Sequence, residues 1–161
     1  GIHSLQPVTG RNHLIETDTL MILDDCYNAN PASMRASLDV LALATGRRVA
    51  VMGDMKELGE NEEQLHFETG EYAARKGIDT IVCIGPLACQ MYLGAKNLAS
   101  GNTVLHYTGK KEFLHDLPSL FEAGDTVLVK ASNSMKFSEI VEALTEFEAN
   151  TKDEIEKGAK Q

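Results

Sequence analysis

The sequence predicts a three-layer α/β domain, in which helices cover both faces of a mostly parallel sheet of about six strands. Short apolar segments alternate with amphipathic helical segments along most of the chain. Several of the apolar segments are uninterrupted, which is typical of strands that are covered on both faces. Strand–helix–strand units form right-handed crossovers into a parallel sheet. With 161 residues, the chain has the length of one domain.

The predicted domain begins with a hairpin and a helix. Two short apolar runs, residues 13–17 and 19–25, flank a tight turn. This arrangement predicts a hairpin that places the N-terminal strand at the edge of the sheet. A helix is expected over residues 31–44, because Asn30 suits the N-cap and Pro31 suits the first helical position.

The rest of the chain repeats the strand–helix pattern. The later strands are expected at residues 47–53, 79–85, 102–107 and 125–131, with amphipathic helical segments between and after them. Asn61 and Gln64 resemble a capping box at the start of one helix, and Gly77 is its expected end. Pro86 is expected to open the next helix and Ser134 to cap the last one. The order of elements predicts a Rossmann-like architecture.

Composition excludes several classes of protein. The formal charge of −9 argues against duplex nucleic acid as a partner, because phosphate binding needs a basic face. No apolar run approaches the ~20 residues of a membrane span, and the first residues do not resemble a signal peptide. Three cysteines without a CxxC pair predict neither a disulfide framework nor a thiolate zinc site. We therefore expect reduced thiols in a cytoplasmic protein.

The domain boundaries follow from composition. Residues 1–11 are expected to be an interdomain linker, residues 12–148 the folded domain, and residues 149–161 a polar tail.

Ligands of such sheets bind beyond the carboxyl ends of the strands. The richest segment at that position is DDCYNANP, residues 24–31. A carboxylate such as Asp25 can accept two hydrogen bonds from a ribose diol, although a turn carboxylate is an equal alternative. Asn30 suits a helix cap better than a ligand contact, and Tyr27 either faces a ligand or covers the helix edge.

Other polar residues follow the remaining strands. Lys130 is placed to meet an anionic ligand, with a helix–sheet salt bridge as the alternative. Asp54, Lys56 and Glu57 either face the same crevice or lie in a solvated loop, and the loop is slightly favoured. His66 is expected to be a packed or surface histidine rather than a catalytic base.

Some well-known motifs are absent. The chain contains no GxxxxGK[ST] phosphate loop, no GxGxxG dinucleotide fingerprint and no HExxH metal motif. The sequence therefore predicts ligand-facing loops without a phosphate cradle or a metal cluster of their own.

Two motifs occur in a specific order along the chain. Residues 24–34 read as the pattern DDxYNANPxSM and residues 53–59 as GDMxELG, with Gly10-Arg11 before them. By these residues the chain resembles the C-terminal domain of the Mur ligases, in particular of the members that add D-alanyl-D-alanine. Residues 129–135 read VKASNSM in place of VKGSxSM, with Ala131 replacing the commoner glycine and Asn133 replacing a frequent arginine. The resemblance covers about residues 5–147.

The resemblance implies an ATP-dependent ligase that activates a UDP-N-acetylmuramoyl-tripeptide as an acyl phosphate, which the amine of D-alanyl-D-alanine then attacks. It implies that a central domain holds ATP and Mg²⁺ and that an N-terminal domain holds the UDP end. The C-terminal domain closes over them, so the isolated chain is expected to be inactive and to carry no catalytic residue. The implied nucleotide contacts are Arg11, Asp25, Tyr27, Asn28 and Asn30, and the implied dipeptide contacts are Asn28, Lys130 and Ser132.

Two other classes of protein remain open at this point. A phosphorylation-switched receiver domain has a similar order of elements, an acidic pair after its first parallel strand and a lysine after its fifth. It also needs an aspartate after the third parallel strand, where this chain has Gly85-Pro86. A non-catalytic nucleotide-binding module is the second alternative, since a fold does not fix a function.

Overall fold

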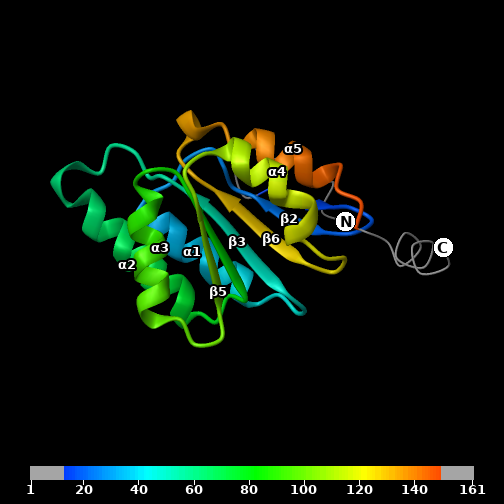
Figure 1. The fold of residues 1–161 in the computed structure, drawn as a ribbon, viewed down its shortest axis with the longest axis horizontal. Helices are drawn as coiled ribbons and strands as arrows, with labels where there is room; N and C mark the ends of the chain where they lie inside the picture. The colour runs from blue at the N-terminus through cyan, green and yellow to red at the C-terminus, as the bar shows by residue number, and fades with distance from the viewer. Residues whose placement is uncertain (1–12, 150–161) are drawn as a thin grey trace.

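The computed structural model describes residues 13–149 and shows the expected α/β architecture (Figure 1). Its strands are β1 (His13–Glu16), β2 (Met21–Asp24), β3 (Arg48–Gly53), β4 (Thr80–Ile84), β5 (Thr103–Tyr107) and β6 (Thr126–Lys130). Its helices are α1 (Pro31–Ala42), α2 (Glu62–Arg75), α3 (Ala88–Leu98), α4 (Lys110–Leu120) and α5 (Ser138–Thr145). Short 3₁₀ turns, η2 (Gly59–Asn61) and η3 (Asn133–Met135), precede α2 and α5.

The six strands form one sheet in the order β1-β2-β6-β3-β4-β5. β1 pairs antiparallel with β2, and every other pairing in the sheet is parallel. The predicted edge hairpin and mostly parallel sheet are therefore confirmed. The carboxyl ends of β2, β6, β3 and β4 lie next to one another, so the loops that follow these strands share one edge of the sheet.

Helices cover both faces of the sheet (Figure 1). On one face, α1, α2 and α3 bury a cluster around Leu38, Met52 and Met91. On the other face, α4 and α5 bury a cluster around Val51, Phe113 and Phe137. Both clusters exclude water from the central strands, which explains why β3 and β4 are almost entirely apolar.

The start of α1 is fixed as the sequence predicts. Asn30 Oδ1 accepts a hydrogen bond from the Ser33 backbone N–H at 2.8 Å, and the Asn30 N–H donates to Ser33 Oγ at 3.0 Å. Pro31 occupies the first helical position, where its missing N–H costs nothing.

Asn61 occupies the N-cap of α2, as expected, but its side chain makes no capping hydrogen bond, and a 3₁₀ turn, Gly59–Asn61, precedes the helix. Two other predicted helix starts are wrong. α3 starts at Ala88 rather than Pro86. Ser134 lies inside another 3₁₀ turn, and Phe137 takes the N-cap position of α5.

Two glycines let α2 and α3 pack at backbone distance. A Cβ atom at Gly70 would lie 1.8 Å from the Met91 carbonyl oxygen, and one at Gly94 would lie 1.9 Å from the Phe67 carbonyl oxygen. Both values are far below a van der Waals contact, so any side chain at these positions would push the helices apart.

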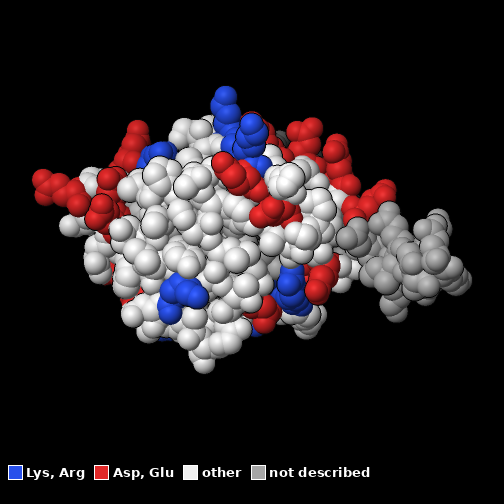
Figure 2. Space-filling view, in the orientation of Figure 1, with Lys and Arg blue, Asp and Glu red and all other residues white. Residues whose placement is uncertain are grey.

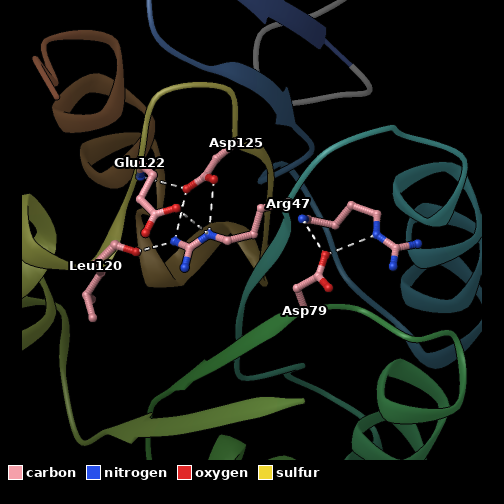
Figure 3. A network of polar contacts seen from close by, with 6 residues as sticks. Arg47, Asp79, Leu120, Glu122 and Asp125 are labelled. Carbon is pink, nitrogen blue, oxygen red and sulfur yellow. Dashed lines mark hydrogen bonds and ion pairs between the residues drawn. The ribbon is translucent and has the colours of Figure 1, made fainter. Parts of the chain in front are cut away.

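The amino ends of the central strands are tied by two arginines (Figure 3). The Arg47 guanidinium donates from Nε and Nη2 to the two Asp125 carboxylate oxygens, at 3.0 Å each. Arg48 donates from its backbone N–H and from Nε to Asp79 Oδ2, at 2.9 and 3.3 Å. The Asp125 side chain is 1% exposed and the Asp79 side chain is 44% exposed, so the first pair is much better shielded from solvent.

The charged surface is mixed. In Figure 2, acidic side chains lie mostly toward the margin of the face, and basic side chains form one small group at the top beside acidic ones, with the others scattered. Within residues 13–149, no helix is long and apolar enough to span a membrane.

Candidate functional site

A groove of about 650 Å³ opens beside α1 at the carboxyl edge of the sheet. Its floor and outer wall are apolar and are formed by Leu14, Leu23, Ala36, Val40 and Leu128. Its remaining lining residues are polar or aromatic: Asp25, Tyr27, Asn28, Asn30, Ser33, Ser37 and Lys130. The structure thus brings four of the predicted nucleotide contacts and Lys130 together around one groove. Arg11, the fifth predicted nucleotide contact, lies outside the described residues.

Asp25 is the most strongly held polar residue of the groove. It is 8% exposed, and its Oδ2 accepts hydrogen bonds from Lys130 Nζ and from Ser37 Oγ, both at 2.6 Å. Lys130 comes from the end of β6 and Ser37 from α1, so the carboxylate is fixed from two elements. Lys130 therefore forms a buried ion pair, as the alternative expected, although its partner Asp25 lies in the loop after β2 and not on a helix.

Lys130 also reaches the turn that follows Asp25. Its Nζ donates to the Asn28 carbonyl oxygen at 3.1 Å. Asn30 caps α1 while it lines the groove, so the helix cap and the groove wall are the same residue. Tyr27 is 40% exposed and lies at the mouth of the groove.

Ser132 does not line this groove. It is 6% exposed, its Oγ accepts a hydrogen bond from the Lys56 N–H at 2.8 Å, and its own N–H donates to the Asp54 carbonyl oxygen at 3.1 Å. These bonds join the loop after β6 to the loop after β3. A contact between Ser132 and a dipeptide stays a prediction.

The expectation that Asp54 lies in a solvated loop is wrong. Its side chain is fully buried, and Oδ1 accepts a hydrogen bond from the Ala88 N–H at 2.8 Å. This bond caps the first turn of α3 and explains why that helix starts at Ala88. Asp54 Oδ2 forms an ion pair with Lys56 Nζ at 3.5 Å, without hydrogen-bond geometry.

His66 is a packed histidine, as expected. It is fully buried, and its Nε2 accepts a hydrogen bond from the Met55 N–H at 2.9 Å. Its Nδ1 lies 2.6 Å from the Glu62 carbonyl oxygen, so Nδ1 carries the proton and donates it. Both ring nitrogens are therefore used to hold the loop between β3 and α2.

A second hollow, of about 490 Å³, lies on the other side of Tyr27. Its other lining residues are Cys26, Asn133, Ser134, Lys136, Phe137 and Ser138. Burial and the Asp24 carboxylate, which accepts a hydrogen bond from the Cys26 thiol, raise the pKa of Cys26 to about 12. None of the site residues predicted from the sequence lies after Ser132. The only available signal was the cluster of small and polar residues in the turn before the last helix.

Metal-binding groups are not gathered anywhere in the described part of the chain. Among residues 13–149, no three His, Cys, Asp or Glu residues are placed to hold a metal ion together. The receiver-domain alternative also lacks support, because β4 ends in Ile84 and is followed by Gly85 and Pro86 rather than by an aspartate.

The carboxylate, amides and apolar floor of the groove, at the carboxyl edge of a parallel sheet, define a ligand-binding α/β domain. Comparison with known proteins makes this class specific. The sequence model of the family "Mur ligase, glutamate ligase domain" matches residues 10–133, and the chain belongs to this family.

Its relatives include UDP-N-acetylmuramoyl-tripeptide–D-alanyl-D-alanine ligases. The Bacillus subtilis protein is 38% identical over 149 residues, which cover 91% of this chain and 33% of the relative. The Escherichia coli protein is also 38% identical over 149 residues and is covered to 32%. The chain therefore spans about a third of the length of these relatives.

Solved structures show the same relationship. A crystal structure of MurF from Acinetobacter baumannii superimposes with a TM-score of 0.80 at 32% identity, covering 88% of this chain and 31% of that one. MurF from Thermotoga maritima, in complex with ADP, gives a TM-score of 0.73 at 30% identity, covering 89% of this chain and 32% of that one.

Proposed function

We propose that this chain is the C-terminal domain of an ATP-dependent ligase that adds D-alanyl-D-alanine to UDP-N-acetylmuramoyl-tripeptide in cytoplasmic peptidoglycan precursor synthesis. The relatives that support this proposal carry that activity in their names, and one solved relative is a complex with ADP. The observation that carries it is the convergence of Asp25, Tyr27, Asn28 and Asn30 on one groove.

The groove suits a nucleoside. The Asp25 carboxylate can accept hydrogen bonds from the hydroxyls of a ribose, and the Asn28 amide can donate and accept at the same time. The apolar floor, which includes Leu23 and Leu128, suits the face of a base. We assign the nucleotide contacts of this domain to these residues, together with Arg11.

The phosphate end of ATP and the Mg²⁺ ion are assigned to the central domain of the same ligase. The sequence contains no phosphate loop, and residues 13–149 gather no metal-binding cluster. When bound there, ATP supplies the phosphoryl group that activates the peptide carboxylate. This chain contributes by closing over the nucleotide, which brings the reactants together and excludes water.

The incoming dipeptide is assigned to the region between the two hollows. Asn28 lines the groove, Tyr27 lines both hollows, and Ser132 precedes the second hollow directly in sequence. The polar residues that line this second hollow suit the charged ends of a dipeptide, with Lys136 available to its carboxylate.

The test uses the full-length ligase that carries this chain. Purified enzyme with UDP-N-acetylmuramoyl-tripeptide, ATP, Mg²⁺ and D-alanyl-D-alanine should release phosphate and form the pentapeptide product, as detected by mass spectrometry. L-alanyl-L-alanine serves as the matched control and should give no comparable product. The 161 residues alone should give none under any of these conditions. Absence of product from the folded full-length enzyme, or robust turnover by the 161 residues, would contradict the proposal.

A further inference from the structure

Lys130 is a buried cation at the point where the groove-forming elements meet. It stands at the end of β6 and is only 2% exposed. A buried ammonium group is costly unless it is paired and hydrogen-bonded. Lys130 meets this requirement with two oxygens of the same turn, Asp25 Oδ2 at 2.6 Å and the Asn28 carbonyl oxygen at 3.1 Å.

Both of these oxygens belong to groove-lining residues. Lys130 therefore holds a side chain and a piece of backbone that a ligand in the groove would contact. Ser37 Oγ donates to the same Asp25 oxygen at 2.6 Å from α1. The carboxylate is thus clamped between the sheet and the helix before any ligand arrives, which is the arrangement that preorganised sites use.

We propose that Lys130 is a positioning residue for the nucleotide: it fixes the orientation of the Asp25 carboxylate and of the Asn28 backbone, and its ammonium group does not contact the ligand. The inference rests on the proposed function. It assigns Lys130 a role different from the direct dipeptide contact that the family resemblance implies. The near-complete burial of Lys130 and its two hydrogen bonds to protein oxygens support this role.

A double-mutant cycle in the full-length ligase separates positioning from direct contact. The variants are Lys130→Met, Asp25→Asn and the combination of both, assayed for kcat and for the KM values of ATP and of D-alanyl-D-alanine. If Lys130 acts through Asp25, either single change should raise the KM for ATP by about tenfold, within the range of coupling between contacting residues. The double variant should be no worse than Asp25→Asn alone. The KM for D-alanyl-D-alanine should stay within about twofold.

Arg47→Met is the matched control for lost stability. It removes an ion pair to a buried carboxylate, Asp125, at the opposite end of the sheet. It should lower the melting temperature while the KM for ATP stays unchanged. If the rise in the KM for ATP in Lys130→Met were only a consequence of lost stability, Arg47→Met would show a similar rise. A similar rise in Arg47→Met would overturn the proposal.

Other outcomes would also overturn it. If the double variant raised the KM for ATP by the product of the two single effects, Lys130 would contact the ligand independently of Asp25. A rise confined to the KM for D-alanyl-D-alanine would show a dipeptide contact. If Lys130→Met does not fold, Lys130→Gln replaces it in the cycle, since it keeps a polar side chain of similar size and removes the charge of the ion pair. An unchanged KM for ATP in a folded Lys130→Gln enzyme would then refute positioning.

Failure of the proposed function would be recognised separately. In that case the wild-type ligase itself forms no pentapeptide. Calorimetric titration of the same wild-type and variant proteins with ADP then tests the positioning role alone. Non-additive weakening of ADP binding supports it, and unchanged or additive binding refutes it.

Discussion

Replacing Gly70 with alanine tests how closely α2 and α3 approach each other. The new Cβ atom would lie 1.8 Å from the Met91 carbonyl oxygen and 2.8 Å from the Ala95 backbone nitrogen. Both obstructing atoms belong to the backbone of α3, so no flexible side chain can move aside. The helices would have to separate by about 1.5 Å to restore a normal contact, which would loosen the cluster beneath them.

The magnitude follows from two opposing effects. Overpacking of this kind costs about 1–3 kcal/mol, and the backbone clash places Gly70→Ala at the upper end of this range. The higher helix propensity of alanine returns about 1 kcal/mol. We expect a net loss of about 2 kcal/mol in the free energy of unfolding. The melting temperature of a domain of this size should fall by about 4–8 °C.

Urea unfolding followed by far-ultraviolet circular dichroism measures this loss. Gly101→Ala is the control, because it has a positive φ of 84° and no atom within 4 Å of the new Cβ, so it reports backbone strain alone. Gly94→Ala should behave like Gly70→Ala, with a Cβ that lies 1.9 Å from the Phe67 carbonyl oxygen. A single separation of α2 from α3 relieves both clashes. The loss in the free energy of unfolding of the double variant should therefore be smaller than the sum of the two single losses. A Gly70→Ala protein as stable as the wild type would refute the argument.

Three further predictions concern other parts of the domain. Asp125→Asn should cost about 3 kcal/mol in urea unfolding, because it weakens the bonds that Arg47 and the Glu122 N–H make to a buried carboxylate. Asp79→Asn, at a half-exposed carboxylate, should cost less than about 1 kcal/mol, and equal losses would contradict this. Burial and a hydrogen bond to a carboxylate raise the pKa of Tyr107 to about 12, so its contribution to stability is complete below about pH 10 and is lost as the pH rises toward 12. Unfolding between pH 9 and 12 should therefore depend less on pH in Tyr107→Phe, and an unchanged slope would count against this. Iodoacetamide at pH 8 should modify the half-buried Cys89 first, because a pKa of about 12 leaves Cys26 protonated, and mass spectrometry that finds Cys26 modified first would refute this order.

Much of the architecture could be predicted from the sequence because local signals agreed with the tertiary structure. Asn30 and Pro31 mark the start of α1 by rules that need no distant partner. The start of α3 could not be found in this way. Its cap is Asp54, which comes from the loop after β3 and reaches Ala88 only once the sheet has formed.

The candidate site shows the same limit. The position of DDCYNANP and of Lys130 at strand ends correctly predicted that they would share one edge of the sheet. The partner of Lys130 was left open between a ligand and an ion pair, because β2 and β6 are neighbours only in three dimensions. The importance of Gly70 was missed entirely, since a glycine inside a helix carries no sequence signal of what faces it.

The two ends of the sheet carry different features. The ion pairs of Arg47 and Arg48 lie where the strands begin, and the loops that line the groove lie where the strands end. Substitutions that raise the thermal stability of this domain can therefore be made at the amino ends of the strands without changing the groove at their carboxyl ends. Directed evolution toward a new ligand can instead change the loops at the carboxyl ends of the strands. A stabilised amino end would then compensate for the stability that such loop substitutions cost.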